Sequence, residues 1–100
     1  MPKPKPDSLT PHQRWVRDVR RQALAAALIA AREQQGLTRA ELAERARIDR
    51  TMLYRIETGR TSLSVDLLWD ICRALGITPS ALLAAAEADD AAAQTLGDEG

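Results

Sequence analysis

Phenylalanine is absent from this chain of 100 residues, and its few aromatic rings belong to two Trp and one Tyr. Because large aromatic side chains are so scarce, a buried core has to be built from Ala, Leu and Ile. Hydrophobic residues make up 45% of the sequence. That is enough for one small domain, and nothing suggests a second one.

Cysteine and histidine each occur once, as Cys72 and His12. A lone cysteine excludes a disulfide within the chain and is typical of a reducing compartment. Its place in an apolar helical stripe predicts a buried thiol. The sequence also lacks a Gly-rich phosphate loop and any group of carboxylates at metal-ligand spacing. We therefore expect a protein that is not an enzyme and that needs no cofactor or metal.

Long hydrophobic runs are missing too. The longest nearly uncharged stretch, residues 22–31, is Ala-rich and ten residues long, about half of what a membrane-spanning helix needs. The first residues lack the apolar core of a signal peptide. We expect a cytoplasmic protein that has no contact with a membrane.

The net charge is zero, but the two signs are unevenly distributed. Residues 1–60 hold thirteen Lys and Arg against seven Asp and Glu, whereas residues 61–100 hold one arginine, Arg73, against seven acids. Such an asymmetry favours a basic face that meets a polyanion and an acidic tail that does not. The alternative is a solvated charged surface.

Residues 38–59 carry the clearest local signals, and they predict two short helices joined by a tight turn. Thr38 and Glu41 have the spacing of a capping box, in which each side chain bonds to the backbone N–H of the other, so a helix should begin there. Its apolar residues share one face and are Leu42, Ala43 and Ala46.

The second helix of this pair should start after Asp49, whose carboxylate is placed to cap it. Gly59 suits the left-handed conformation that ends a helix. The inward stripe consists of Met52, Leu53 and Ile56, and the outward face of Arg50, Thr51, Tyr54 and Arg55. Two helices of about two turns each bury too little surface to be stable alone, so they need flanking helices.

Helical patterns lie on both sides of the pair. Thr10-Pro11 is a helix start, and neither Gly nor Pro follows before Gly36, so this segment forms one long helix or two abutting ones. Beyond the pair, Ser64 is placed to cap a helix over residues 65–75, and Thr78-Pro79 starts another. Trp69 lies beside the apolar face of the 65–75 helix, and we expect it at the rim of the core.

Residues spread over the segment from Leu24 to Leu83 carry a family resemblance. They are Ala43, Leu53, the Ile56-Glu57-x-Gly59 sequence, the ICRALGI segment at 71–77 and Leu82-Leu83. With them the sequence resembles the lambda-repressor-like, Cro and C1-type (XRE) helix-turn-helix family. It departs from the family pattern at Arg47, which stands where a turn glycine is usual. A bulky residue at positive φ there costs roughly 1 kcal/mol.

The resemblance implies an all-α fold, a compact bundle of about five short helices that contains a helix-turn-helix, with an extra N-terminal helical extension. We expect a flexible basic Pro/Lys arm at 1–9, the extension at 10–23, the XRE-type domain at 24–86 with its motif at 38–59 and its recognition helix at 50–58, and an acidic Ala-rich tail at 87–100.

The second motif helix of this family binds the major groove of double-stranded DNA, where each base pair presents its own pattern of donors, acceptors and methyl groups. We predict base contacts from Arg50, Thr51, Tyr54 and Arg55. Either arginine could fork onto a guanine or bind phosphate, and Thr51 could meet a thymine methyl or a phosphate. Asp49 could accept from a cytosine amine, but capping is its favoured role.

Phosphate contacts position such a protein on the duplex. We predict them from Thr38, Arg39, Arg60, Thr61 and Ser62. The family often has glutamine at the position of Arg39. The resemblance also implies a structural role for Arg32 and Glu57, a pair that would fix the recognition helix against the first helix.

Two terminal segments keep alternatives open. Trp15, Val16 and Val19 form an apolar strip beside several arginines. The strip could pack on its own core or form a dimer contact, and the arginines could reach the DNA backbone. The chain after Glu87 could extend the last helix or pair with another protein, but a solvated tail is the default.

We predict a sequence-specific DNA-binding transcription regulator, bacterial or phage-encoded. A monomer that touches only about four or five base pairs would bind weakly, so we expect a homodimer on an inverted-repeat operator. A repressor is favoured by family analogy. The alternative is a protein-interaction module, such as an antitoxin or adaptor, with a partner bound by the N-terminal helix or the acidic tail. Arg50 and Arg55 on the outward face favour DNA.

Overall fold

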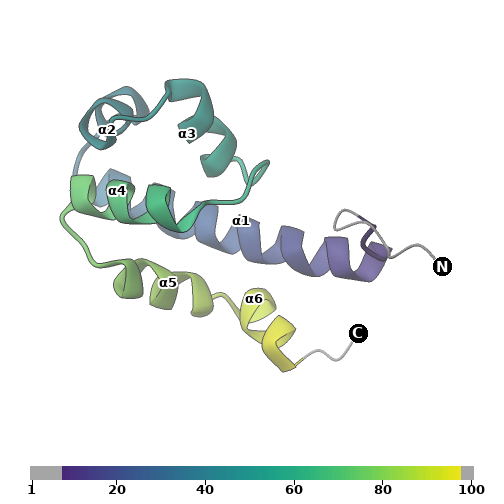
Figure 1. Cartoon of the computed structure of the whole chain (residues 1–100). Helices are drawn as coiled ribbons and strands as arrows, with labels where there is room; N and C mark the ends of the chain where they lie inside the picture. Colours follow the sequence, from purple (N-terminus) through teal and green to yellow (C-terminus); the bar gives the residue numbers. More distant parts are fainter. Residues whose placement is uncertain (1–7, 98–100) are drawn as a thin grey trace.

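A computed structural model describes residues 8–97 of the chain, so most of the predicted basic arm lies outside the described residues. Over that range the chain is all α-helical, as predicted (Figure 1). The helices are α1 (Pro11–Gln34), α2 (Arg39–Ala46), α3 (Arg50–Glu57), α4 (Val65–Leu75), α5 (Pro79–Glu87) and α6 (Asp90–Gln94), followed by the 3-10 helix η1 (Thr95–Gly97).

Helix α1 is continuous over 24 residues, which decides between one long helix and two abutting ones. It begins at the predicted cap, where Thr10 Oγ1 accepts from the Gln13 amide at 3.0 Å. It ends in a Schellman motif, in which Gly36 has a φ of +69° and Leu37 N–H donates to Arg32 O at 3.2 Å. Figure 1 shows α2 and α3 on one side of α1, and α5 and α6 on the other.

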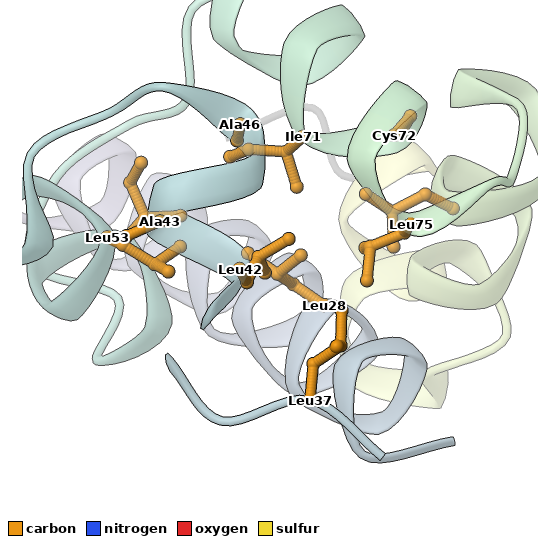
Figure 2. Close-up of a cluster of buried hydrophobic side chains, with 11 residues drawn as sticks. Leu28, Leu37, Leu42, Ala43, Ala46, Leu53, Ile71, Cys72 and Leu75 are labelled. Atoms are coloured by element: carbon orange, nitrogen blue, oxygen red, sulfur yellow. The ribbon is translucent and has the colours of Figure 1, made fainter. Parts of the chain in front are cut away.

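The core is built from Leu, Ile and Ala, as the composition predicts. Figure 2 shows Leu28 of α1 next to Leu42 of α2, with Ile71 and Leu75 of α4 facing them. The largest fully buried side chains are Leu28, Leu42, Leu53, Ile71, Leu82 and Cys72. Burial raises the pKa of the Cys72 thiol, which is the buried and unreactive state predicted for it.

The turn between α2 and α3 has the predicted positive φ at Arg47, with φ +58° and ψ +43°. Ile48 N–H donates to Ala43 O at 3.0 Å. The same bond pattern ends α1 and α4, where Gly36 and Gly76 hold the left-handed position. Arg47 thus occupies a glycine position, at a cost of roughly 1 kcal/mol.

Two local predictions are wrong. Asp49 is the N-cap of α3 by position, but its carboxylate makes no capping hydrogen bond. Its carboxylate still places a negative charge near the N-terminus of α3, which is the positive end of the helix dipole. Trp69 is 63% exposed because it lies with Val65 on the outer face of α4, whereas Ile71 and Leu75 take the inner face.

Residues 88–97 fold back on α1 instead of forming a solvated tail. Arg20 donates from Nε to Thr95 Oγ1 at 2.8 Å and from Nη2 to Thr95 O at 3.1 Å. Thr95 and Ala92 are buried, and α6 packs against α1. On the same half of α1, Val16 is buried while Trp15 stays exposed, so the apolar strip of the extension packs only in part on its own core.

Within residues 8–97, no single helix is long and apolar enough to cross a membrane. Helices α4 and α5 are together long and apolar enough for a membrane span, but the chain bends by 101° between them. Four buried residues of that pair, Ile71, Cys72, Leu75 and Leu82, belong to the hydrophobic core described above.

Candidate nucleic-acid interface

The four residues predicted to contact bases lie on the exposed face of α3. At about 3.6 residues per turn, Arg50, Tyr54, Thr51 and Arg55 occupy one arc of roughly 140°, and all four are exposed. The opposite side of α3 holds Leu53 and Ile56, which are buried in the core. The apolar stripe therefore fixes which side of the short helix faces solvent.

Helix α3 is tied to α1 by the predicted pair of Arg32 and Glu57. Arg32 Nε donates to Glu57 Oε2 at 2.8 Å, and Nη2 donates to Oε1 at 3.1 Å. The side chain of Glu57 is 0% exposed and that of Arg32 is 13% exposed. Arg32 Nη1 also donates to Leu37 O at 2.9 Å. A two-point bond of this kind fixes orientation as well as distance.

Arg39 shares the same buried carboxylate, which the sequence does not reveal. Its Nε donates to Glu57 Oε1 at 3.0 Å, while its side chain stays 41% exposed. One carboxylate therefore accepts from two guanidinium groups, which together carry one positive charge more than Glu57 neutralises. The terminal Nη nitrogens of Arg39 are left to bind other groups.

Tyr54 lies beside two of the residues predicted to contact phosphate. The guanidinium carbon of Arg39 is 5.1 Å from the centroid of its ring, and that of Arg60 is 5.8 Å away. Both distances are within the range of a cation–π contact. A hollow of about 250 Å³ opens between α2 and α3, and it is lined by Arg39, Ala40, Arg50, Thr51 and Tyr54.

The N-terminus of α2 is capped by a capping box. Thr38 Oγ1 accepts from the Glu41 amide at 3.1 Å, and the Thr38 amide donates to Glu41 Oε1 at 2.9 Å. The bond from the Thr38 backbone, together with that from its hydroxyl, lowers the pKa of Glu41. The Thr38 amide is therefore already used, and its hydroxyl hydrogen would have to leave Glu41 to contact a phosphate.

The remaining predicted phosphate residues follow α3 in the chain. Arg60 and Ser62 are exposed and Thr61 is half-buried. The Arg60 amide donates to Arg55 O at 2.9 Å, which fixes the chain direction as it leaves the helix. Of the predicted site residues, Thr38, Arg55, Arg60, Thr61 and Ser62 are not among those that line the hollow.

One contact near this surface is also absent from the sequence-based prediction. Gln22, in the N-terminal half of α1, donates from Nε2 to Thr58 O at 3.3 Å. The Gln22 amide fills the space that a Cβ at Gly59 would need. The segment that precedes the family's first helix therefore touches the end of α3. Neither residue type carries a signal that would have indicated this pair.

Among residues 8–97, no three His, Cys, Asp or Glu side chains come together in a way that could hold a metal ion. The chemistry of the surface described above is that of guanidinium, hydroxyl and aromatic groups. Such groups bind phosphate oxygens and the edges of bases.

Comparison with known proteins gives a family and several solved relatives. A helix-turn-helix family model matches residues 28–82. The clp gene regulator ClgR from Corynebacterium glutamicum is 38% identical with a TM-score of 0.68, over 71% of this chain and 92% of that one. An XRE-family like protein from Pseudomonas syringae pv. tomato str. DC3000 is 32% identical with a TM-score of 0.69, over 81% and 99%.

A hypothetical transcription factor, NHTF from Neisseria, is 28% identical with a TM-score of 0.60, over 63% of this chain and 72% of that one. The search of curated proteins gives no significant match. The family model spans more than half of the chain and includes α2, α3 and α4. The chain therefore belongs to the XRE, or Cro and C1-type, helix-turn-helix family of DNA-binding transcription regulators.

Proposed function

We propose that this protein is a cytoplasmic repressor that binds an inverted-repeat operator as a homodimer, with α3 of each subunit in the major groove. The observation that carries the proposal is the exposed polar face of α3, which presents Arg50, Thr51, Tyr54 and Arg55. The names of the solved relatives, a gene regulator and a transcription factor, support a role in gene regulation.

Base reading is assigned first to the two arginines. Arg50 is the first residue of α3, and the leading end of a recognition helix lies closest to the base edges. Arg55 lies a little more than one turn further on. A guanidinium that forks onto guanine O6 and N7 discriminates against other bases by about 1–3 kcal/mol. Thr51 lies between them in position to meet a thymine methyl group.

Phosphate binding is assigned to residues on either side of α3. Arg39 lies at the start of α2, and its side chain stays 41% exposed although its Nε donates to Glu57. Arg60 follows α3 and is exposed. Thr38, Thr61 and Ser62 add hydroxyl groups. Contacts of this kind fix the register of the protein and make affinity fall with salt.

A dimer is part of the proposal because one subunit reads only about four or five base pairs. The two recognition helices would then lie roughly 34–36 Å apart, one turn of the duplex. The chain offers exposed apolar side chains for such a contact on α1, α4, α5 and η1, namely Trp15, Val65, Trp69, Leu83 and Leu96.

A protein-interaction module is the second candidate, and one observation favours it. A groove of about 520 Å³ lies between α1, α5 and α6, and it is lined mostly by apolar residues that include Leu24, Leu83 and Leu96. A partner protein could bind there. This role is compatible with DNA binding, because α2 and α3 lie on the other side of α1 (Figure 1).

The experiment that tests the assignments compares Arg55→Ala with Arg39→Ala on a selected operator and on its single-base variants. Arg55→Ala should relax the preference at one base position. Arg39→Ala should weaken binding to all sequences about equally and lower the salt slope by roughly one unit. If both variants lose specific and nonspecific affinity in equal measure, the division into base and phosphate contacts is wrong.

A further inference from the structure

Tyr54 has neighbours that do not fit a residue reading a base. Its ring lies within 5.1 Å of the Arg39 guanidinium carbon and within 5.8 Å of that of Arg60. These two arginines come from the start of α2 and from the loop after α3. The ring therefore joins two separate backbone segments through their cationic side chains.

A second anchor acts on one of these arginines. Glu57, buried directly behind this surface, accepts from Arg39 Nε at 3.0 Å. With Nε held by the carboxylate and the guanidinium plane near the ring, Arg39 is restrained at two points. Arg60 has no carboxylate partner among the ion pairs of the described residues, so the ring is its main restraint.

We propose that Tyr54 is a positioning residue that holds Arg39 and Arg60 ready for DNA phosphates, and that it does not read a base. This inference rests on the proposed DNA-binding function and changes the role of one residue within it. A base stacked on this ring would have to displace one of the two cations, and the attraction lost in this way has to be regained elsewhere.

The physical advantage is a lower entropic cost of binding. A free arginine side chain on a protein surface samples many rotamers, and a phosphate contact immobilises it. When the ring restricts those rotamers beforehand, less freedom is lost on contact with DNA. The gain does not depend on sequence, because phosphates are the same at every base pair.

The test uses two substitutions of Tyr54, which is 41% exposed and outside the core cluster. Tyr54→Leu removes the ring and keeps an apolar side chain of good helix propensity. Tyr54→Phe, the matched control, keeps the ring and removes the hydroxyl. Affinity is measured for the selected operator and for a random duplex of equal length, each at several salt concentrations, and melting temperature is measured in parallel.

Tyr54→Phe should bind both duplexes within about twofold of the wild type, since the ring supplies the attraction. Tyr54→Leu should weaken both duplexes by the same factor, roughly five- to thirtyfold, because two arginine side chains then become ordered only on binding. Its salt slope should stay close to that of the wild type, because Arg39 and Arg60 keep their charge. Tyr54→Phe should leave the melting temperature unchanged, and Tyr54→Leu should lower it by only several degrees, because cation–π contacts at an exposed site are weak.

Three results would overturn the inference. Tyr54→Leu could bind both duplexes as well as the wild type, or it could lose affinity for the operator alone. Tyr54→Phe could lose its preference at one base pair, which would mean that the hydroxyl reads a base.

An NMR experiment without DNA separates this inference from the proposed function. The Nε–Hε signals of Arg39 and Arg60 should be shifted by the ring current in the wild type and in Tyr54→Phe, and that shift should vanish in Tyr54→Leu. Unchanged signals in Tyr54→Leu would contradict the stacking itself. A wild-type protein that binds no duplex would overturn the proposed function, even with the ring-current shifts present.

Discussion

Arg32 and Glu57 lie 25 positions apart in the chain and join α1 to α3 through two hydrogen bonds, of 2.8 and 3.1 Å. The carboxylate is fully buried and the guanidinium nearly so. Burying either charge alone would be costly, because it would lose its hydration without compensation. In the pair, each group makes hydrogen bonds to the other that compensate for part of this loss. The orientation of α3 against α1 therefore depends on this pair.

Removing the negative charge should strongly destabilise the fold. Glu57→Gln leaves Arg32 buried without a counter-charge, and we expect a loss of about 3–5 kcal/mol in the free energy of unfolding. Chemical denaturation measures it. Glu44→Gln, at an exposed position of α2, is the matched control and should change stability little. A loss below about 1 kcal/mol for Glu57→Gln, as for a surface pair, would contradict this account.

Relieving the backbone strain at Arg47 should stabilise the protein. Its φ of +58° is one that glycine adopts without penalty, so Arg47→Gly should raise stability by up to about 1 kcal/mol. Thermal unfolding is the measurement. Gly76→Ala is the converse control, because a Cβ there meets no atom within 4 Å and strain alone should destabilise it. A lower melting temperature for Arg47→Gly would show that the side chain contributes more than its backbone costs.

Glu41 should contribute to stability in a way that depends on pH. Hydrogen bonds from Thr38 lower the pKa of its carboxyl group in the folded protein. A lowered pKa means that the folded state binds a proton less readily than the unfolded state. The contribution is therefore complete above the ordinary pKa of glutamate and is lost as the pH falls through the lowered value.

The measurement is unfolding of the wild type and Glu41→Gln from neutral to acid pH. Glutamine keeps a capping side chain but does not titrate. The two curves should differ most at neutral pH and converge in acid. A difference that stays constant over the whole range would mean that the charge of Glu41 is not involved.

The contact between α6 and α1 predicts that the C-terminal segment contributes to stability but not to DNA binding. Thr95→Val keeps the shape of the side chain but removes the oxygen that accepts from Arg20 Nε at 2.8 Å. We expect the free energy of unfolding to fall by roughly 1–3 kcal/mol, because a buried hydrogen bond from a charged donor is lost. Cleavage after Glu87 by added protease should become faster. Unchanged stability would instead support the solvated tail predicted from composition.

Much of the fold follows from local sequence signals. Thr10, Thr38 and Ser64 begin helices where their side chains accept backbone hydrogen bonds, and Gly36 and Gly76 follow the ends of α1 and α4. The apolar spacing identified the face of α3 that is buried, and by difference the face that is exposed. These features depend on residues within a turn or two of each other, so they can be recognised from the spacing of residues in the sequence.

The contacts that were not predicted join distant segments. Arg39 meets Glu57 and Tyr54 because of the angle between α2 and α3, which no spacing encodes. The α6 contact pairs Arg20 with Thr95, 75 positions away. An Ala-rich acidic segment has the composition of a solvated tail, so only the partner surface on α1 makes it fold back. Asp49 has the right residue type for a cap, but its carboxylate makes no capping bond.

The measurement that tests the central claim most directly is selection from a random duplex library at near-physiological salt. The wild type and the double variant Arg50→Ala, Arg55→Ala are run in parallel. The account predicts that the wild type enriches an inverted repeat with half-sites about one helical turn apart, and that the variant, which keeps Arg39 and Arg60, enriches none. If the wild type enriches no sequence, or if the variant enriches the same one, the exposed face of α3 is not the reading surface.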